Sequence, residues 1–195
     1  MKLSALILIP TISSLLVALS AAPKKPIMSW PPASETNYVD VDKFDLDPDL
    51  EITLWAKSPL FYNPTNMSID PKGRIWVTEG VNYREKLGIR RNAGDRIMVL
   101  IDADQDGKAD QSKVFLQDPY LESPLGISVF DNKIIISQPP DIVIYTDVNR
   151  DLKFDPKIDK KEILLTGFNG RQHDHSLHSI TSGPDGKWYF NSGNC

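Results

Sequence analysis

The feature that most constrains the fold is a short hairpin pattern that occurs three times along the chain. Each copy consists of a strand, a tight turn and a second strand, and the copies span residues 67–80, 127–138 and 180–191. Asn132 and the pairs Lys72-Gly73 and Asp185-Gly186 supply residues that tolerate the positive φ of hairpin turns. Three copies of one hairpin predict a protein built from repeated β units.

A second pattern recurs between the hairpins. Apolar strands at 95–102 and 141–147 each lead into an acidic loop, and further strands follow at 113–116 and 162–165. The loops begin at Asp102 and Asp147, which lie 45 residues apart in the sequence. That spacing is typical of a four-stranded propeller blade of roughly 40–50 residues. An open sandwich, the alternative, would not need so long a repeat.

These patterns predict an all-β fold, an incomplete β-propeller with about two and a half four-stranded blades of a six- or seven-bladed propeller. Residues 50–55 alternate apolar and polar side chains, which predicts a half-buried strand. Trp76 and Trp188 stand at matching places in two of the hairpins, so both are expected in the cores of their blades.

The N-terminus is typical of an export signal. Lys2 precedes an apolar run, and small residues end it at 18–22. We expect a signal peptide at 1–22, a linker rich in Pro and Lys at 23–43, and the truncated propeller domain at 44–195. The protein is then periplasmic or extracellular. An uncleaved membrane anchor is the alternative, because the apolar run approaches the roughly 20 residues that span a bilayer.

The net charge argues against nucleic acid as a partner, and the cysteine content excludes a covalent haem within this sequence. The net charge of −4 leaves no basic surplus to hold nucleic acid through its phosphates. Cys195 is the one cysteine, so no internal disulfide and no covalent haem site can form within these residues.

All three histidines, His173, His175 and His178, fall in one short stretch. Neighbouring imidazoles can hold a transition metal, and a single one can act as a general base near neutral pH. The alternative is a polar connection between blades that happens to contain histidines.

The stretch also resembles the signature of the soluble quinoprotein glucose and sorbosone dehydrogenases, which are six-bladed propellers that use pyrroloquinoline quinone and Ca²⁺. Asp174-His175 precedes Gly183-Pro184-Asp185 by seven residues, as in that family. The resemblance implies that His175 takes the proton of a sugar or alcohol hydroxyl while hydride passes to the quinone. Asn194 stands where the family has the carboxylate that orients the base, and an amide can orient an imidazole without stabilising its charged form.

A wider resemblance covers Phe44 to Cys195. The Asn63-Pro64-Thr65 turn, the strand at 73–77, the acidic loops and the segment 175–179 are similar to the N-terminal propeller of the membrane-bound dehydrogenase-like, PVC-type haem-binding CxxCH proteins. It implies a sugar or alcohol substrate and an electron acceptor such as a cytochrome c domain, with haem only in sequence beyond Cys195.

The first acidic loop has the spacing of a calcium-binding loop. Carboxylates occupy positions 1, 3, 5 and 9 of the loop, Gly stands at position 6, and the main-chain carbonyl at position 7 is a further ligand. The candidate Ca²⁺ ligands are therefore Asp102, Asp104, Asp106, Lys108 and Asp110. A charged, solvated turn is the alternative. The second loop is a poorer match, since Leu152 replaces the Gly and Arg150 places a cation inside it.

Two functional classes are consistent with these observations. The first is an exported oxidoreductase domain that oxidises a sugar or alcohol and passes the electrons onward. The second is a non-catalytic propeller that binds a glycan or a protein. The spacing of His175 from Gly183-Pro184-Asp185 favours the first class, and Asn194 favours the second.

Overall fold

The computed structural model describes residues 40–83, 91–169 and 176–193. Within them the chain forms a short 3-10 helix, η1 (Val41–Lys43), and ten strands. The strands are β1 (Pro64–Ile69), β2 (Ile75–Glu79), β3 (Arg96–Ile101), β4 (Gln111–Gln117), β5 (Gly126–Phe130), β6 (Lys133–Gln138), β7 (Asp141–Thr146), β8 (Lys160–Thr166), β9 (Leu177–Ser182) and β10 (Trp188–Ser192). No helix in these ranges is long and apolar enough to cross a membrane.

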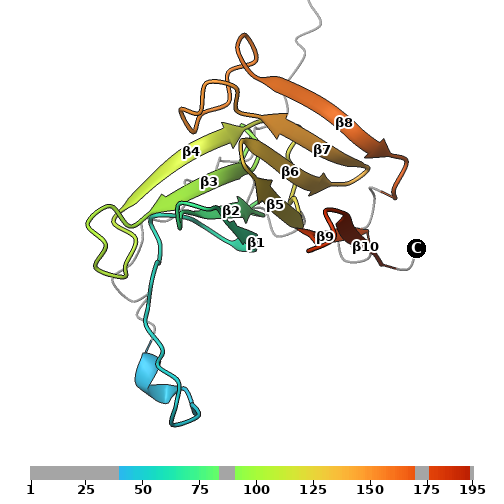
Figure 1. Cartoon of the computed structure of the whole chain (residues 1–195). Helices are drawn as coiled ribbons and strands as arrows, with labels where there is room; N and C mark the ends of the chain where they lie inside the picture. The colour runs from blue at the N-terminus through green and yellow to red at the C-terminus, as the bar shows by residue number, and fades with distance from the viewer. Residues whose placement is uncertain (1–39, 84–90, 170–175, 194–195) are drawn as a thin grey trace, which may run out of the picture.

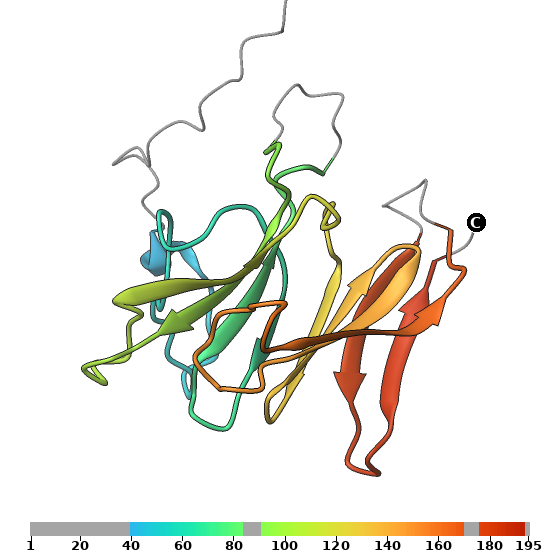
Figure 2. The ribbon, with the colours of Figure 1, turned by 90° about the horizontal axis from the view of Figure 1, so that it is seen from above.

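The strands form three antiparallel sheets in which each strand pairs with its neighbour in sequence. The first sheet has the order β1-β2-β3-β4, the second β5-β6-β7-β8, and the third contains β9 and β10. Figures 1 and 2 show the sheets following one another in chain order. The all-β prediction and its four-stranded units are confirmed, and each predicted hairpin forms the first two strands of one sheet. The number of blades and the closure of a ring stay predictions.

The first strands of the three sheets, β1, β5 and β9, lie next to one another. Asn66 of β1 donates its side-chain amide to the carbonyl of Leu125, just before β5, and to Ser179 Oγ of β9, both at 3.1 Å. Gly126 opens β5, and a Cβ there would lie 2.5 Å from the carbonyl oxygen of His178. Only glycine lets the two backbones approach so closely. Sheets whose first strands pack beside one another in this way form a propeller-like arrangement.

Apolar side chains fill the spaces between successive sheets. Trp76 and Phe115 of the first sheet meet edge to face with their ring centroids 5.1 Å apart, and Tyr145 of the second sheet belongs to the same buried cluster. A second cluster around Ile135 and Ile142 joins the second sheet to the third.

The two hairpin tryptophans do not occupy matching places. The first pair after the turn is Ile69 with Ile75 in one hairpin and Ser182 with Trp188 in the other, so Trp188 corresponds to Ile75. One residue fewer separates Trp188 from its turn glycine, and a shift of one residue turns a side chain to the opposite face. Trp76 is therefore buried between the first and second sheets, while Trp188 packs between the second and third.

The predicted strand at 50–55 is wrong. These residues form no strand, and Trp55 accepts one backbone hydrogen bond, from the N–H of Ala109 at 2.7 Å. Trp55 packs on the face of the first sheet that the second sheet leaves free, beside Val77 and Leu100. The alternating pattern reflects one side of an extended segment that rests on a sheet without joining it.

Candidate functional site

The two residues that the sequence nominates for catalysis, His175 and Asn194, lie outside the described residues, as does His173. Their described neighbours in the chain are Ser176 and Gly193. The N–H of Gly193 donates to the carbonyl of Ser176 at 2.9 Å, and Ser176 is buried. The start of β9 and the end of β10 are thereby joined at one end of the third sheet.

The equivalent end of the first sheet carries a buried charged network. Glu79, the last residue of β2, is 0% exposed. Arg96 donates to both of its carboxylate oxygens, through Nε and Nη2 at 2.7 Å each, and Arg91 donates to Oε2. The N–H of Tyr62 adds a bond of 2.8 Å. Two guanidinium groups thus compensate a carboxylate that water does not reach. Strands β2 and β10 are each the second strand of their sheet. Glu79 ends β2 and Gly193 follows β10, so the two residues lie at equivalent ends of the first and third sheets.

A second buried carboxylate, Asp95, stands next to this network. It accepts the N–H of Asn82 at 3.2 Å and the N–H of Ser123 at 2.8 Å. Burial raises the pKa of Asp95 by more than the hydrogen bonds from Ser123 and Asn82 lower it. Asn82 also holds Arg91, accepting its N–H at 2.6 Å and donating to its carbonyl at 3.1 Å. Sequence reasoning missed both carboxylates, because their partners belong to separate loops and form no local motif.

The first acidic loop lies at the opposite end of the first sheet. Asp102, Asp104 and Asp106 each present an oxygen within 4.8 Å of the others. The N–H of Lys108 donates to Asp106 at 2.8 Å, while Asp110 accepts the N–H of Ala103 at 3.1 Å. Three of the four predicted carboxylates are therefore gathered, and this oxygen set fits Ca²⁺. Strand β3 begins at Arg96 and its six residues span about 20 Å before this loop, so an ion here would be remote from the end at which β9 begins and β10 ends.

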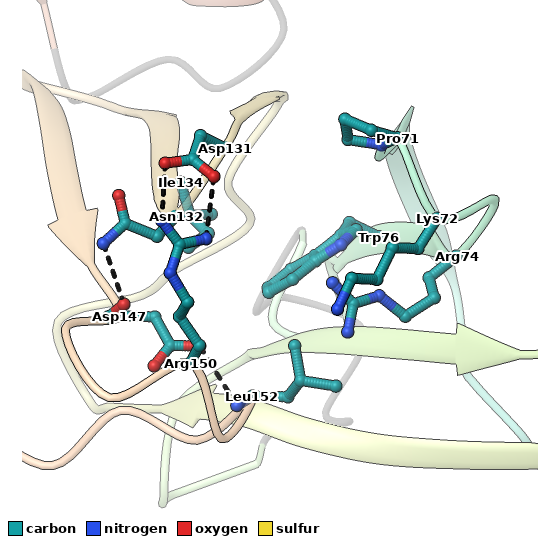
Figure 3. A pocket seen from close by; sticks show the side chains of 10 residues that line it. All are labelled: Pro71, Lys72, Arg74, Trp76, Asp131, Asn132, Ile134, Asp147, Arg150 and Leu152. Atoms are coloured by element: carbon teal, nitrogen blue, oxygen red, sulfur yellow. Dashed lines mark hydrogen bonds and ion pairs between the residues drawn. The ribbon is translucent and has the colours of Figure 1, made fainter.

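A small pocket of about 110 Å³ also opens at this opposite end, between the first two sheets. Figure 3 shows Lys72 and Arg74 on one side and Arg150 on the other. Arg150 is paired with Asp131 at 2.7 Å, and Arg74 with Asp70 at 2.6 Å. The pocket walls therefore hold ion pairs that already compensate most of their charge.

Comparison with known proteins gives one family. The model described as "Domain of unknown function (DUF7133)" matches residues 38–195. The chain belongs to the DUF7133 family. No curated protein sequence matches it.

Two solved structures are similar to this DUF7133 chain. One is the iodide structure of a Trichoderma reesei protein of Carbohydrate-Active Enzymes Family AA12, with 19% identity and a TM-score of 0.44 over 63% of this chain and 27% of that one. The other is a protein assigned as a gluconolactonase, with 13% identity and a TM-score of 0.43 over 67% of this chain and 42% of that one. The chain thus spans less than half of either structure.

Proposed function

We propose that this DUF7133 chain is part of an exported oxidoreductase that oxidises a sugar or an alcohol, with His175 as the general base and Asn194 as the residue that orients it. The observation that carries the proposal is the hydrogen bond from Gly193 to Ser176. His175 and Asn194 are each one peptide unit, about 3.8 Å between α-carbons, from one of these two joined residues. Chain continuity therefore supports a pairing of the imidazole with the amide.

In this proposal His175 accepts the proton of the substrate hydroxyl. The Asn194 side chain holds the imidazole by a hydrogen bond but adds no negative charge to stabilise it once protonated. A bound pyrroloquinoline quinone would supply the hydride acceptor. Arg91 and Arg96 would hold carboxylates of such a cofactor, because their side chains are 19% exposed and Glu79 does not occupy all of their N–H groups. A cytochrome c domain would receive the electrons.

The test compares two histidine variants in the full-length protein. Loss of a general base lowers a rate by roughly 10²–10⁴-fold, so His175→Ala should abolish quinone-dependent dye reduction while His173→Ala spares most of it. If the histidines instead hold a metal, both substitutions should strip it about equally. Wild-type activity and metal content in both variants would show that the cluster is structural.

The second candidate, a non-catalytic module that binds a glycan or a protein, is favoured by one residue, Asn194. In a Ser-His-Asp system the same exchange of Asp for Asn lowers kcat by about 10⁴. An inactive wild-type protein that still binds a glycan would support this candidate.

We also propose that the first acidic loop binds Ca²⁺ through Asp102, Asp104, Asp106, Asp110 and the Lys108 carbonyl. Calorimetry with the wild-type protein and with Asp104→Ala tests this. Identical titrations, or no heat at millimolar Ca²⁺, would leave a charged, solvated turn.

A further inference from the structure

The second acidic loop differs from the first in sequence, but the two loops share one backbone structure. In the first loop Asp102 Oδ2 accepts the N–H of Gly107 at 3.0 Å. In the second loop Asp147 Oδ2 accepts the N–H of Leu152, also at 3.0 Å. Each loop is thus wound around the carboxylate that begins it.

The positive φ angles fall at the same places. Gln105 and Arg150 have φ of 63° and 62°, and Gly107 and Leu152 have φ of 86° and 68°. Leu152 therefore adopts the conformation that usually requires glycine. Its side chain is buried in the core between the first and second sheets, and this burial offsets the backbone cost.

The residue that closes each loop also corresponds. Asp110 accepts the N–H of Ala103, seven residues earlier, and Asp159 accepts the N–H of Val148 at 2.8 Å, eleven residues earlier. Asp159 is therefore the structural counterpart of Asp110. Sequence spacing alone would have given Asp155 as the counterpart. The second loop is the first loop with four residues inserted before its closing carboxylate.

The second loop buries two carboxylates, which accept backbone N–H groups, and Asp147 interacts with the charge of Arg150 only at longer range. Asp147 is 3% exposed and Asp159 is 8% exposed, and Asp147 Oδ1 is buried without a hydrogen-bond partner. Among the described residues no lysine or arginine forms an ion pair with either carboxylate. Figure 3 shows the Asp147 carboxylate beside the backbone of Arg150, inside the loop, while the Arg150 guanidinium reaches out to Asp131. Buried charges in proteins are normally paired or bound to a metal.

We propose that residues 147–159 form a second divalent-cation site of the Ca²⁺ type. The ligands are Asp147 Oδ1, the side chains of Asn149 and Asp151, and the main-chain carbonyl of Lys153, in loop positions 1, 3, 5 and 7. In the structure Asn149 donates its amide to Asp151 Oδ2 at 2.9 Å. Turning that amide over gives up the long hydrogen bond of 3.4 Å from the Asp151 N–H to Asn149 Oδ1. It places two oxygens side by side, which a cation would bridge. An adaptable all-oxygen set of this kind suits Ca²⁺ better than Mg²⁺, which demands near-ideal octahedral geometry.

The site does not depend on the proposed oxidation. It lies at the end of the second sheet opposite the start of β9, because β7 runs from Asp141 to Thr146 away from that end. An ion there would lock the β7–β8 connection to the core through Leu152, so its role would be structural.

The test measures ⁴⁵Ca²⁺ binding by equilibrium dialysis in protein carrying Asp104→Ala, which silences the first loop. One equivalent should bind with a Kd of roughly 10⁻⁴–10⁻³ M, the range of extracellular modules. Asp151→Ala should weaken binding at least about tenfold, and Asn149→Asp should tighten it about tenfold by adding a charged ligand. Asp151 is exposed, so its loss should leave the fold intact, and the gain in Asn149→Asp cannot arise from misfolding. Absence of binding at millimolar Ca²⁺, or equal affinity in all three proteins, would overturn the proposal.

Discussion

The turn of the first hairpin depends on one carboxylate. Asp70 accepts four hydrogen bonds, from the backbone N–H groups of Lys72 (2.9 Å) and Arg74 (3.1 Å), from Arg74 Nε (2.6 Å) and from Trp76 Nε1 (2.9 Å). Asp70 and Trp76 are both buried. Burial by itself raises the pKa of Asp70, but the hydrogen bonds from Trp76 and Arg74 outweigh it and hold the pKa below its ordinary value of 3.8.

Asp70→Ala should therefore destabilise the protein by about 3–4 kcal/mol. A hydrogen bond to a charged group contributes roughly 1.5–3 kcal/mol, and the buried indole N–H of Trp76 loses its partner outright. The two turn amides can rebind water, so their loss adds little. Urea unfolding followed by tryptophan fluorescence at low protein concentration gives the free-energy change, and hydrogen exchange of β1 and β2 shows whether it is local.

The third hairpin provides a matched control. Asp185 accepts the hydroxyl of Tyr189 at 2.8 Å and the N–H of Lys187 at 3.2 Å, but Asp185 and Tyr189 are exposed. Exposed polar pairs contribute about 0–1 kcal/mol, so Asp185→Ala should cost no more than that. Equal losses in Asp70→Ala and Asp185→Ala would refute the argument from burial.

The pH dependence follows from the lowered pKa of Asp70. Because the folded pKa lies below the unfolded value, the stabilisation is fully present above about pH 4. It is lost as the pH falls through the folded pKa. The stability difference between the wild type and Asp70→Ala should thus shrink between about pH 4 and pH 2. A difference that stays constant over this range would contradict the assignment of the effect to the ionised carboxylate.

Two further predictions concern stability and association. Glu79→Gln leaves two partly buried guanidinium groups without their anion and should cost about 2–4 kcal/mol; a loss below 1 kcal/mol in urea unfolding would show that solvent compensates them. Residues 23–195 alone should self-associate at tens of micromolar, because Met67 and Ile69 on the free face of the first sheet are 63% and 61% exposed and Ile163 on β8 is 58% exposed. Light scattering checks this, and a sharp cooperative melt of a monomer would contradict it.

Strand positions could be predicted from the sequence because local chemistry sets them. Glycines that adopt positive φ, such as Gly73 and Gly186, mark where two of the hairpins reverse, and apolar runs mark the strands between them. In the second hairpin the positive φ falls on Asp131 and not on the predicted Asn132. What failed was the strand predicted at 50–55, which lies on a sheet without joining it, and the register of two further elements. Trp188 stands one residue nearer its turn glycine than Trp76 does, which turns it to the other face of its sheet. The counterpart of Asp110 depends on a four-residue insertion in the second loop.

The candidate site was harder to predict, for a different reason. Glu79, Arg91 and Arg96 meet only when the ends of β2 and β3 and the loop between them are folded, and no spacing pattern in the sequence joins them. The carboxylates of the first loop lie within nine residues of one another, so spacing sufficed for them. Contacts between separate loops follow from the packing of the sheets, which sequence periodicity does not describe.

The most direct test of the proposed oxidation is the rate of quinone-dependent dye reduction by the full-length protein with a panel of sugars and alcohols. Three forms are compared, namely the wild type, His175→Ala and Asn194→Asp. The proposal predicts activity in the wild type, its loss by roughly 10²–10⁴-fold in His175→Ala, and a faster rate in Asn194→Asp, where a carboxylate stabilises the protonated imidazole. An inactive wild-type protein, or a His175→Ala variant that keeps the wild-type rate, would contradict it.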